Sequence, residues 1–193
     1  MLSAQPSPKP CCNCGKDFIP QYTNMQVACS LRCAASYAKK QRLAKEKQER
    51  EQTKARKEKI KSVSEWEDEC RKIVQKIARI RDRHDGCISC HMGPNYGGQW
   101  HGSHYRSVGA CSNTQFLLWN IHKACAQCNM HKGGNRESYR PRLIEKIGLE
   151  RVEWLDAQNQ VTKRSGAAYI EYLKRFKAVM GKRLRRMEKR IQE

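Results

Sequence analysis

The cysteines of this chain occur in pairs whose spacing is typical of metal ligands. Cys87 and Cys90 form one C-x-x-C pair, and Cys125 and Cys128 form a second pair after 34 intervening residues. A C-x-x-C turn directs two thiolates toward one ion, and Zn²⁺ prefers four such ligands in a tetrahedron. The spacing therefore predicts a structural zinc site, because four protein ligands leave no open position for chemistry.

A second set of four cysteines lies near the amino terminus. Cys11 and Cys14 form a C-x-x-C pair, and Cys29 and Cys33 follow with C-x-x-x-C spacing. This pattern predicts a second four-cysteine zinc site that serves folding or binding, with no catalysis of its own. Cys12 adjoins Cys11, so the sequence leaves open which of the two is the first ligand.

The overall composition points to a polyanionic partner. The 193 residues carry a formal net charge of +20 and include eleven cysteines. Residues 1–10 lack the apolar core of a secretory signal, and no run approaches the roughly 20 apolar residues of a membrane span. We therefore expect a cytoplasmic protein with reduced thiols that bind metal. Nucleic acid is favoured over an anionic membrane, because no strongly amphipathic apolar face accompanies the charge.

Composition divides the chain into four segments that would position these residues. We expect a four-cysteine zinc finger over residues 1–38, a charged helical linker over 39–62, a core over 63–140, and a basic helical region over 141–193. The linker fits either a solvated spacer or an arm along phosphates. Within the core, Ser64 and Glu67 fit a capping box that starts an amphipathic helix. The glycine-rich residues 94–109 predict a loop and hairpin, and helices are expected over 139–147 and from 162 to about 190.

Histidines and asparagines lie between and around the second set of cysteine pairs. A histidine on a hairpin, an asparagine before the second pair, and asparagine and histidine after it match the ββα-metal pattern of zinc-supported HNH nucleases. The segments CISC, WHGSHYRSVGA, NIHKACAQCNMHKGGN and ESYR resemble the NinG/Rap family of phage recombination nucleases. The amino-terminal CCNCGKDF and ACSLRCAASYA resemble that family's finger, so the similarity covers nearly the whole chain.

The resemblance implies a fold, an activity and partners. The fold would be a small zinc-stabilised α+β structure with a ββα-metal (HNH) core, an amino-terminal four-cysteine zinc finger and basic helices. The activity would be a DNA structure-specific endonuclease that cuts Holliday junctions or D-loops during phage or prophage recombination. Two symmetric cuts at a junction imply a homodimer, and other phage recombination proteins are candidate partners.

Phosphodiester hydrolysis suggests a role for each polar residue of the core. His104 is the predicted general base, because an imidazole titrates near neutral pH. The resemblance implies that Asn129 holds a catalytic Mg²⁺ or Mn²⁺ ion and that Asn120 holds the loop near His104 through its amide. His101 occupies the position where the family commonly carries an acidic residue, so the second ligand stays open between His101 and His131.

Five cations of the core are candidate phosphate contacts, with plain solvated charge as the alternative. They are Arg106, Lys123, Lys132, Arg136 and Arg140. The competing function is a non-catalytic, zinc-dependent nucleic-acid-binding accessory protein of recombination. It would keep both zinc sites and the positive charge and would make no use of His104.

Overall fold

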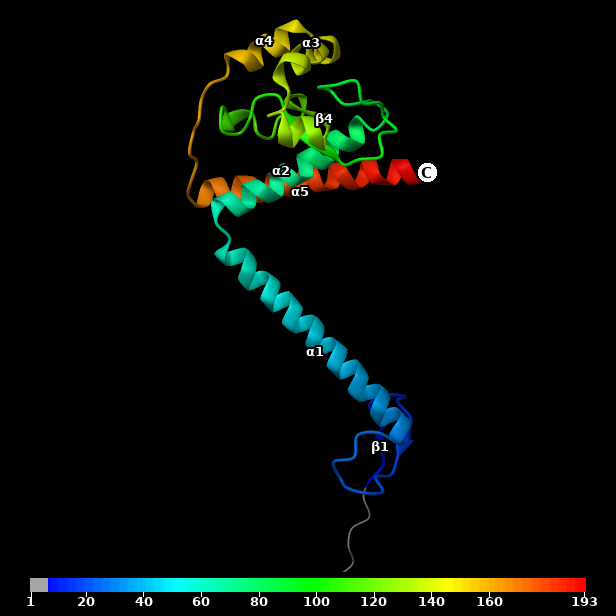
Figure 1. Cartoon of the computed structure of the whole chain (residues 1–193). Coiled ribbons are helices and arrows are strands. Elements are labelled where there is room, and N and C mark those ends of the chain that lie inside the picture. The colour runs from blue at the N-terminus through cyan, green and yellow to red at the C-terminus, as the bar shows by residue number, and fades with distance from the viewer. Residues whose placement is uncertain (1–6) are drawn as a thin grey trace, which may run out of the picture. The chain divides into compact units, whose positions relative to one another are not determined.

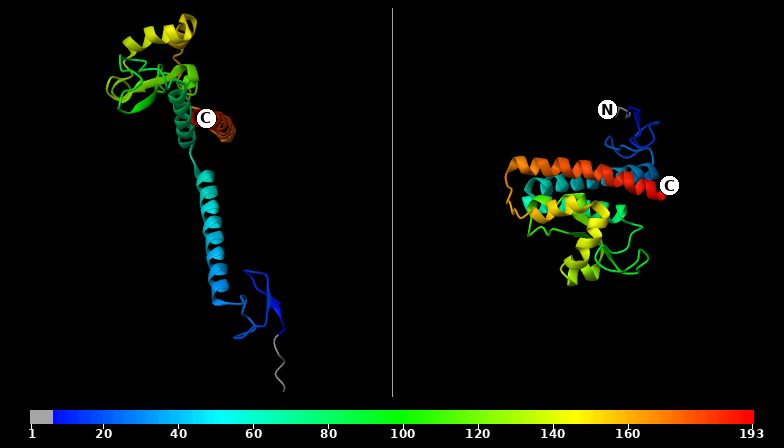
Figure 2. Two further views of the ribbon diagram at one scale, coloured as in Figure 1. Left: turned by 90° about the vertical axis from the view of Figure 1, so that its right-hand side faces the viewer. Right: turned by 90° about the horizontal axis from the view of Figure 1, so that it is seen from above.

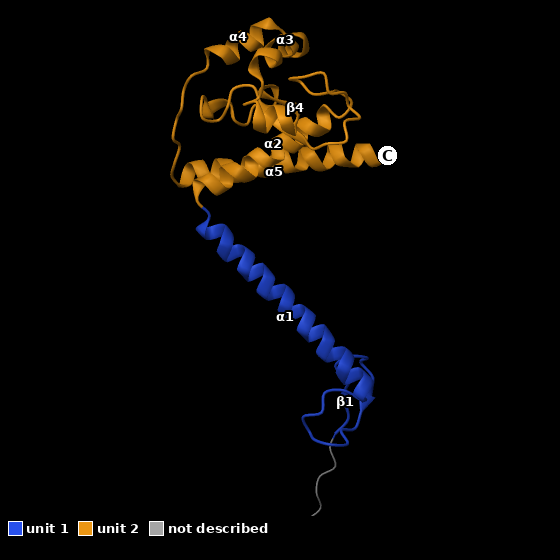
Figure 3. Ribbon diagram, viewed as in Figure 1, with its two compact units in different colours: residues 1–61 blue, residues 62–193 orange. Residues whose placement is uncertain are grey.

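The structure is a computed structural model that describes residues 7–193, so the first six residues of the predicted amino-terminal finger lie outside the described part. Contacts divide the chain into two compact units, Met1–Lys61 and Ser62–Glu193 (Figure 3). The first unit contains strands β1 (Lys9–Pro10) and β2 (Asp17–Phe18) and helix α1, and the second contains all later elements (Figure 1). Helices thus accompany two separate two-stranded sheets, which makes this a small α+β protein.

Helix α1 extends from Leu31 to Ile60 and starts inside the cysteine-rich segment, eight residues before the predicted linker. The Ser30 side chain caps it by accepting a hydrogen bond from the amide of Cys33. All 30 residues of this helix are described, and none of them is buried. Good helix formers and the cap must therefore stabilise α1, because packing against a core does not.

Helix α2 spans Val63–Arg81, and its capping box differs from the predicted one. Ser62 and Glu65 exchange the two hydrogen bonds of the box, two residues before the predicted Ser64 and Glu67. The chain contains a serine followed three residues later by glutamate in both registers, so the motif alone could not separate them. The earlier start lets the first helical residue pack against the apolar cluster at this end of the helix.

Helix α5, Ala167–Gln192, packs along the apolar face of α2 (Figures 1 and 2). It starts five residues later than the sequence predicted. Leu173 is fully buried in the cluster that contains Trp66 and Cys70 of α2. The Cys70 thiol donates to the Leu173 carbonyl at 3.4 Å, which agrees with the expectation that Cys70 belongs to the core.

Strands β3 (Trp100–His104) and β4 (Ile121–Cys125) form an antiparallel pair that packs against α2. Trp100 pairs with Cys125, so the pairing reaches the second set of cysteines. Gly102 faces α2 so closely that an added Cβ would lie 2.7 Å from the Cα atom of Gln75. Only glycine permits this approach, and the sheet can therefore lie directly against the helix.

Two short helices cover the other side of the second unit. Helix α3 spans Arg136–Ile147, three residues longer at its start than predicted, and Gly148 ends it with a φ of +88°. Helix α4, Leu149–Ala157, follows at once and was not predicted. The two helices contribute Tyr139, Leu143, Val152 and Leu155 to the main apolar core.

Asp82 gives the second unit a pH-dependent stability. Its side chain is 2% exposed and accepts hydrogen bonds from Arg81 and Lys146 and from the backbone amide of Lys123. Burial alone raises the pKa of Asp82, but the hydrogen bonds from Arg81 and Lys146 outweigh it and lower the pKa to about 2. The charged form therefore stabilises the fold above pH 4.

We expect the free energy of unfolding of the second unit to fall by about 2 kcal/mol as the pH drops from about 4 to 2. Protonation then removes an interaction that only the folded state has. Denaturant unfolding at several pH values measures the change, and the variant Asp82→Asn is the control. A variant that keeps the wild-type pH profile would assign the acid sensitivity to other carboxylates.

None of the helices in residues 7–193 combines the length and the apolar character that a membrane span needs.

Candidate active site and metal centres

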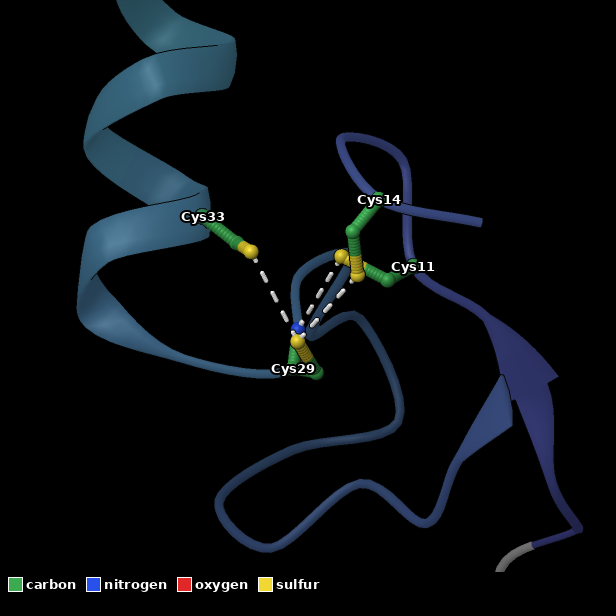
Figure 4. A group of neighbouring side chains, drawn as sticks. All are labelled: Cys11, Cys14, Cys29 and Cys33. Carbon is green, nitrogen blue, oxygen red and sulfur yellow. Dashed lines mark hydrogen bonds between the residues drawn. The ribbon is translucent and has the colours of Figure 1, made fainter. Parts of the chain in front are cut away.

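The first cysteine cluster lies where β1 (Lys9–Pro10), β2 (Asp17–Phe18) and the first turn of α1 meet (Figure 4). The four sulfur atoms lie within 4.8 Å of one another; they belong to Cys11, Cys14, Cys29 and Cys33. Cys12 is exposed and is not part of the cluster, so Cys11 is the one of the two whose sulfur joins the other three. Gly15, directly after Cys14, has a φ of +72°, a conformation that glycine adopts readily in a tight turn.

Backbone amides favour the thiolate form of Cys11 in this cluster. The amide of Cys29 donates to Sγ of Cys11 at 3.4 Å. The backbone hydrogen bonds of Cys14 and Cys29 lower the pKa of the Cys11 thiol to about 6. Four converging sulfurs with amide donors suit Zn²⁺, which binds thiolates in a tetrahedron. The cluster could therefore bind zinc.

The second cluster joins the loop after α2 to the end of β4. Its sulfur atoms also lie within 4.8 Å of one another and belong to Cys87, Cys90, Cys125 and Cys128. The amides of Ser89 and Cys125 donate to Sγ of Cys87 at 3.4 and 3.3 Å. This set could bind zinc as well, and its four ligands would fill the coordination shell.

A cleft of about 470 Å³ opens beside β3, between α2 and the turn that follows β4. That turn is the π-helix η3, Gln127–His131, which begins between the last two cysteines of the second cluster. The amide of Asn129 donates to Nδ1 of His101 at 3.1 Å, and both side chains line the cleft. The structure therefore brings together two of the predicted metal ligands. His131 is exposed at the end of η3 and does not line this cleft.

His104 lies away from this pair. Side chains alternate along a strand, and His104 shares the α2-facing side of β3 with Gly102. Its Nε2 is 2.9 Å from the carbonyl oxygen of Gln115, which can only accept a hydrogen bond. The proton must therefore be on Nε2, and Nδ1 keeps a free lone pair. Burial lowers the pKa of His104 below its ordinary value, more than the bond to Gln115 raises it.

Asn120 is fully buried and makes the kind of loop contact that the sequence predicted. Its Oδ1 accepts from the amide of Arg106 at 2.8 Å, and its Nδ2 donates to the carbonyls of Arg106 and Thr114, both at 3.1 Å. The Asn120 carbonyl also accepts from the amide of Tyr105 at 2.9 Å. These bonds fix the chain directly after His104. Asn120 therefore positions the loop and does not face the cleft.

Two of the five predicted phosphate contacts lie buried in the structure and have protein partners. Arg106 is 7% exposed and donates to the carbonyl of Gln158, and Lys123 is 4% exposed and donates to the carbonyl of Arg83. Both cations hold distant segments together, and partners so far along the chain gave no local signal in the sequence.

The other three predicted phosphate contacts lie at the surface. Arg136 and Arg140 are about half exposed and share Asp156 at 2.9 and 3.0 Å. Lys132 is exposed, and among residues 7–193 it has no ion pair or side-chain hydrogen bond. These three cations remain accessible to a phosphate.

Two residues of the cleft were missed by sequence reasoning. Gln75 and Arg79 reach it from α2, one turn apart, opposite His101 and Asn129. The only polar contact of the Arg79 guanidinium among the described residues is a 3.4 Å bond to the Trp100 carbonyl. In the sequence, Arg79 is one basic residue among many on a predicted amphipathic helix. Only the packing of α2 against β3 distinguishes it.

The fold and these sites define a small α+β protein with two four-cysteine clusters that could bind zinc and a polar cleft beside one of them. The family model described as Bacteriophage Lambda NinG protein matches residues 3–190. The chain therefore belongs to the NinG family.

Curated relatives agree with this assignment. Protein ninG of Escherichia phage lambda is 34% identical over 176 residues, which is 82% of this chain and 84% of the relative. Protein ninG of Salmonella phage P22 is 33% identical over 184 residues, covering 85% of this chain and 89% of the relative. That of Escherichia phage 933W is 34% identical over 170 residues, covering 81% and 84%. Among solved structures, none matches the chain.

Proposed function

We propose that this protein is an HNH-type endonuclease of the NinG/Rap kind that hydrolyses phosphodiester bonds in branched DNA, such as Holliday junctions and D-loops. The observation that carries the proposal is the Asn129 carboxamide, 3.1 Å from the His101 imidazole, at an open cleft of a protein with a net charge of +20. The order β3, β4 and η3 with the second cysteine cluster fits a ββα-metal core.

The residues of the cleft fit a divalent cation of intermediate hardness. His101 and Asn129 would hold it, and when bound such an ion supplies Lewis-acid stabilisation at a scissile phosphate. The lining of the cleft, Gln75 and residues 79, 99–102 and 129, contains no carboxylate. Because Mg²⁺ prefers oxygen ligands and imidazole suits Mn²⁺ or Ni²⁺, we expect Mn²⁺ to support activity better than Mg²⁺.

The second cysteine cluster supports this site without taking part in chemistry. Cys128 and Asn129 are neighbours on η3, so a metal held by Cys128 fixes the backbone that carries the carboxamide. Arg79 places a guanidinium at the same cleft, where it can bind a phosphate oxygen. His104, the last residue of β3, does not line the cleft; it is the proposed general base because the Gln115 carbonyl holds the proton on Nε2 and the lowered pKa keeps the ring neutral at pH 7, so a phosphate would have to extend from the cleft to this end of the strand.

The proposed oligomeric state, location and partners follow from the family and from the proposed chemistry. We propose that the protein acts as a homodimer in the cytoplasm of the host cell, because symmetric cleavage of a junction needs two sites. Other recombination proteins of the phage are the proposed protein partners.

A cleavage panel tests the proposal. Purified wild-type protein is incubated with a Holliday junction, a D-loop, a flap and a linear duplex, each with Mg²⁺, Mn²⁺ or Ni²⁺. We expect cleavage of the branched substrates, and we expect Asn129→Ala to reduce it at least about 100-fold. Gln127→Ala, on the exposed side of the same turn, is the matched control. Equal cleavage by the wild type and Asn129→Ala would mark a contaminating nuclease and remove the proposal.

The alternative is a non-catalytic nucleic-acid-binding accessory protein of recombination. The two cysteine clusters and the accessible cations Lys132, Arg136 and Arg140 would serve it equally well. Tight junction binding without cleavage under every metal condition of the panel would favour this alternative.

Arg79 offers a further test of the cleft. Arg79→Ala is expected to lower the rate of cleavage about 10- to 100-fold, since a charge-assisted hydrogen bond is worth about 1.5–3 kcal/mol. Arg79→Lys keeps the charge and is expected to recover part of the loss. Arg83→Ala, at an exposed position in the turn that follows α2, is the control, and single-turnover kinetics separate binding from chemistry. An equal effect at Arg79 and Arg83 would show that only bulk charge matters.

A further inference from the structure

Helix α1 concentrates cations on one of its faces. At 100° per residue, six basic side chains fall within an arc of about 80° around the helix axis. They are Arg32, Lys39, Lys47, Arg50, Lys54 and Lys57, which we call the α1 stripe. From the first to the last, the α1 stripe is about 38 Å long, because the rise is 1.5 Å per residue.

The composition of the α1 stripe differs from that of the rest of the helix. None of the four glutamates of α1 falls within the arc, and Leu43 is the one large apolar side chain there. The rest of the helix surface carries the other five cations and all four glutamates, among them the ion pair of Arg42 with Glu46 at 3.7 Å. The net positive charge of α1 is therefore concentrated in the α1 stripe.

The cations of the α1 stripe are available to a ligand. All six are exposed, and within residues 7–193 none of them has an ion pair or a side-chain hydrogen bond. Glutamates lie only beside the arc, four residues from Arg50 (Glu46) and four residues from Lys54 (Glu58), while Arg50 and Lys54 are themselves like charges at i and i+4. The concentration of exposed cations within the arc favours a polyanionic partner.

We propose that the α1 stripe is a binding site for the phosphate backbone of duplex DNA, which it contacts without reading the base sequence. Duplex DNA presents one negative charge per about 1.7 Å of its axis, so all six cations can find a phosphate. An anionic membrane fits less well, because a helix on a membrane surface needs an apolar face and no residue of α1 belongs to an apolar core. The proposal requires DNA binding and does not require cleavage.

The test compares two variants of the full chain with equal loss of charge. Binding of a 30-base-pair duplex is measured by fluorescence anisotropy at several NaCl concentrations, without added divalent cation. The stripe variant is K39Q/K47Q/R50Q/K54Q, and the control variant on the opposite face is R42Q/K45Q/R56Q/K59Q. Glutamine is a good helix former, and circular dichroism checks that the helix is kept.

The slope of log K against log salt is negative, and each lost phosphate contact should reduce its magnitude by about 0.9. We expect the stripe variant to lose about 3.5 from this slope, and the control variant to lose less than about 1. Equal losses in the two variants, or no loss in either, would overturn the proposal. Binding to vesicles with anionic lipid that falls in the stripe variant, while DNA binding stays unchanged, would overturn it too.

Two single variants keep the test decisive if the quadruple variant loses helicity. Arg50→Gln and Lys54→Gln are each expected to lower the slope by about 0.9, and Arg56→Gln is their control. Because these measurements use binding alone, failure of the cleavage panel leaves the result on the α1 stripe unaffected.

Discussion

Replacing His104 with alanine is expected to lower DNA cleavage by about 10²–10⁴-fold while affinity for a junction is retained. The reason is the state of its imidazole. The Gln115 carbonyl at 2.9 Å holds the proton on Nε2, so Nδ1 can accept a proton from water. Burial lowers the pKa of His104 below 6.5, so the ring is neutral at pH 7. Its activity as a base is then lost only as the pH falls through that lowered pKa.

The roles of these residues can be separated because His101 and Asn129 line the cleft, whereas His104 lies outside its lining and contacts the Gln115 carbonyl. Single-turnover rates for His104→Ala and His101→Ala separate their roles. Excess Mn²⁺ is expected to restore part of the activity of His101→Ala and none of that of His104→Ala. His84→Ala, at an exposed position on the same unit, is the control. Full cleavage by His104→Ala would assign the general base to another group.

Replacing Cys125 with serine is expected to prevent stable folding of the second unit. Cys125 is buried at the end of β4, where its amide also donates to Sγ of Cys87 at 3.3 Å. Structural zinc binding contributes about 10–16 kcal/mol in small zinc domains, and whole domains are stable by only about 5–15 kcal/mol. Loss of one ligand therefore weakens a contribution that is as large as the stability of a whole domain.

Two measurements check this expectation. Zinc content is expected to fall from two ions per chain to one, and the cooperative thermal transition of the second unit is expected to disappear. Cys111→Ala is the matched control, because Cys111 is fully buried and belongs to neither cluster. A Cys125→Ser protein that keeps its zinc and its melting temperature would show that the cluster is not structural.

The spacing of the cysteines correctly predicted the two four-cysteine clusters, because each C-x-x-C pair consists of residues that lie close together in the chain. Cys11 and Cys14 lie on one turn, and so do Cys87 and Cys90. Only the choice between Cys11 and Cys12 needed coordinates. The pattern could not show which ligands are buried, since burial depends on how β4 and α3 close over the second cluster.

The sequence could not predict the surroundings of residues whose contacts come from distant segments of the chain. Arg106 looked like a phosphate contact, but the segment after α4 buries it and supplies its hydrogen-bond acceptors. Helix α4 itself was missed because Gly148, which ends α3, also serves as the residue before α4. The sequence did not distinguish Arg79 from the other basic residues of α2. Its place in the cleft depends on the close approach of β3 to α2, which Gly102 permits.

Cys33 lies in the first turn of α1, so metal binding at the first cluster would affect the stability of this helix. Starting a helix is the costly step, and extending it is cheap. A metal held by Cys33 would, together with the Ser30 cap, fix that first turn in the helical conformation. If the metal were removed, α1 would begin to unwind from this end, and the exposed cations along it would lose their regular spacing.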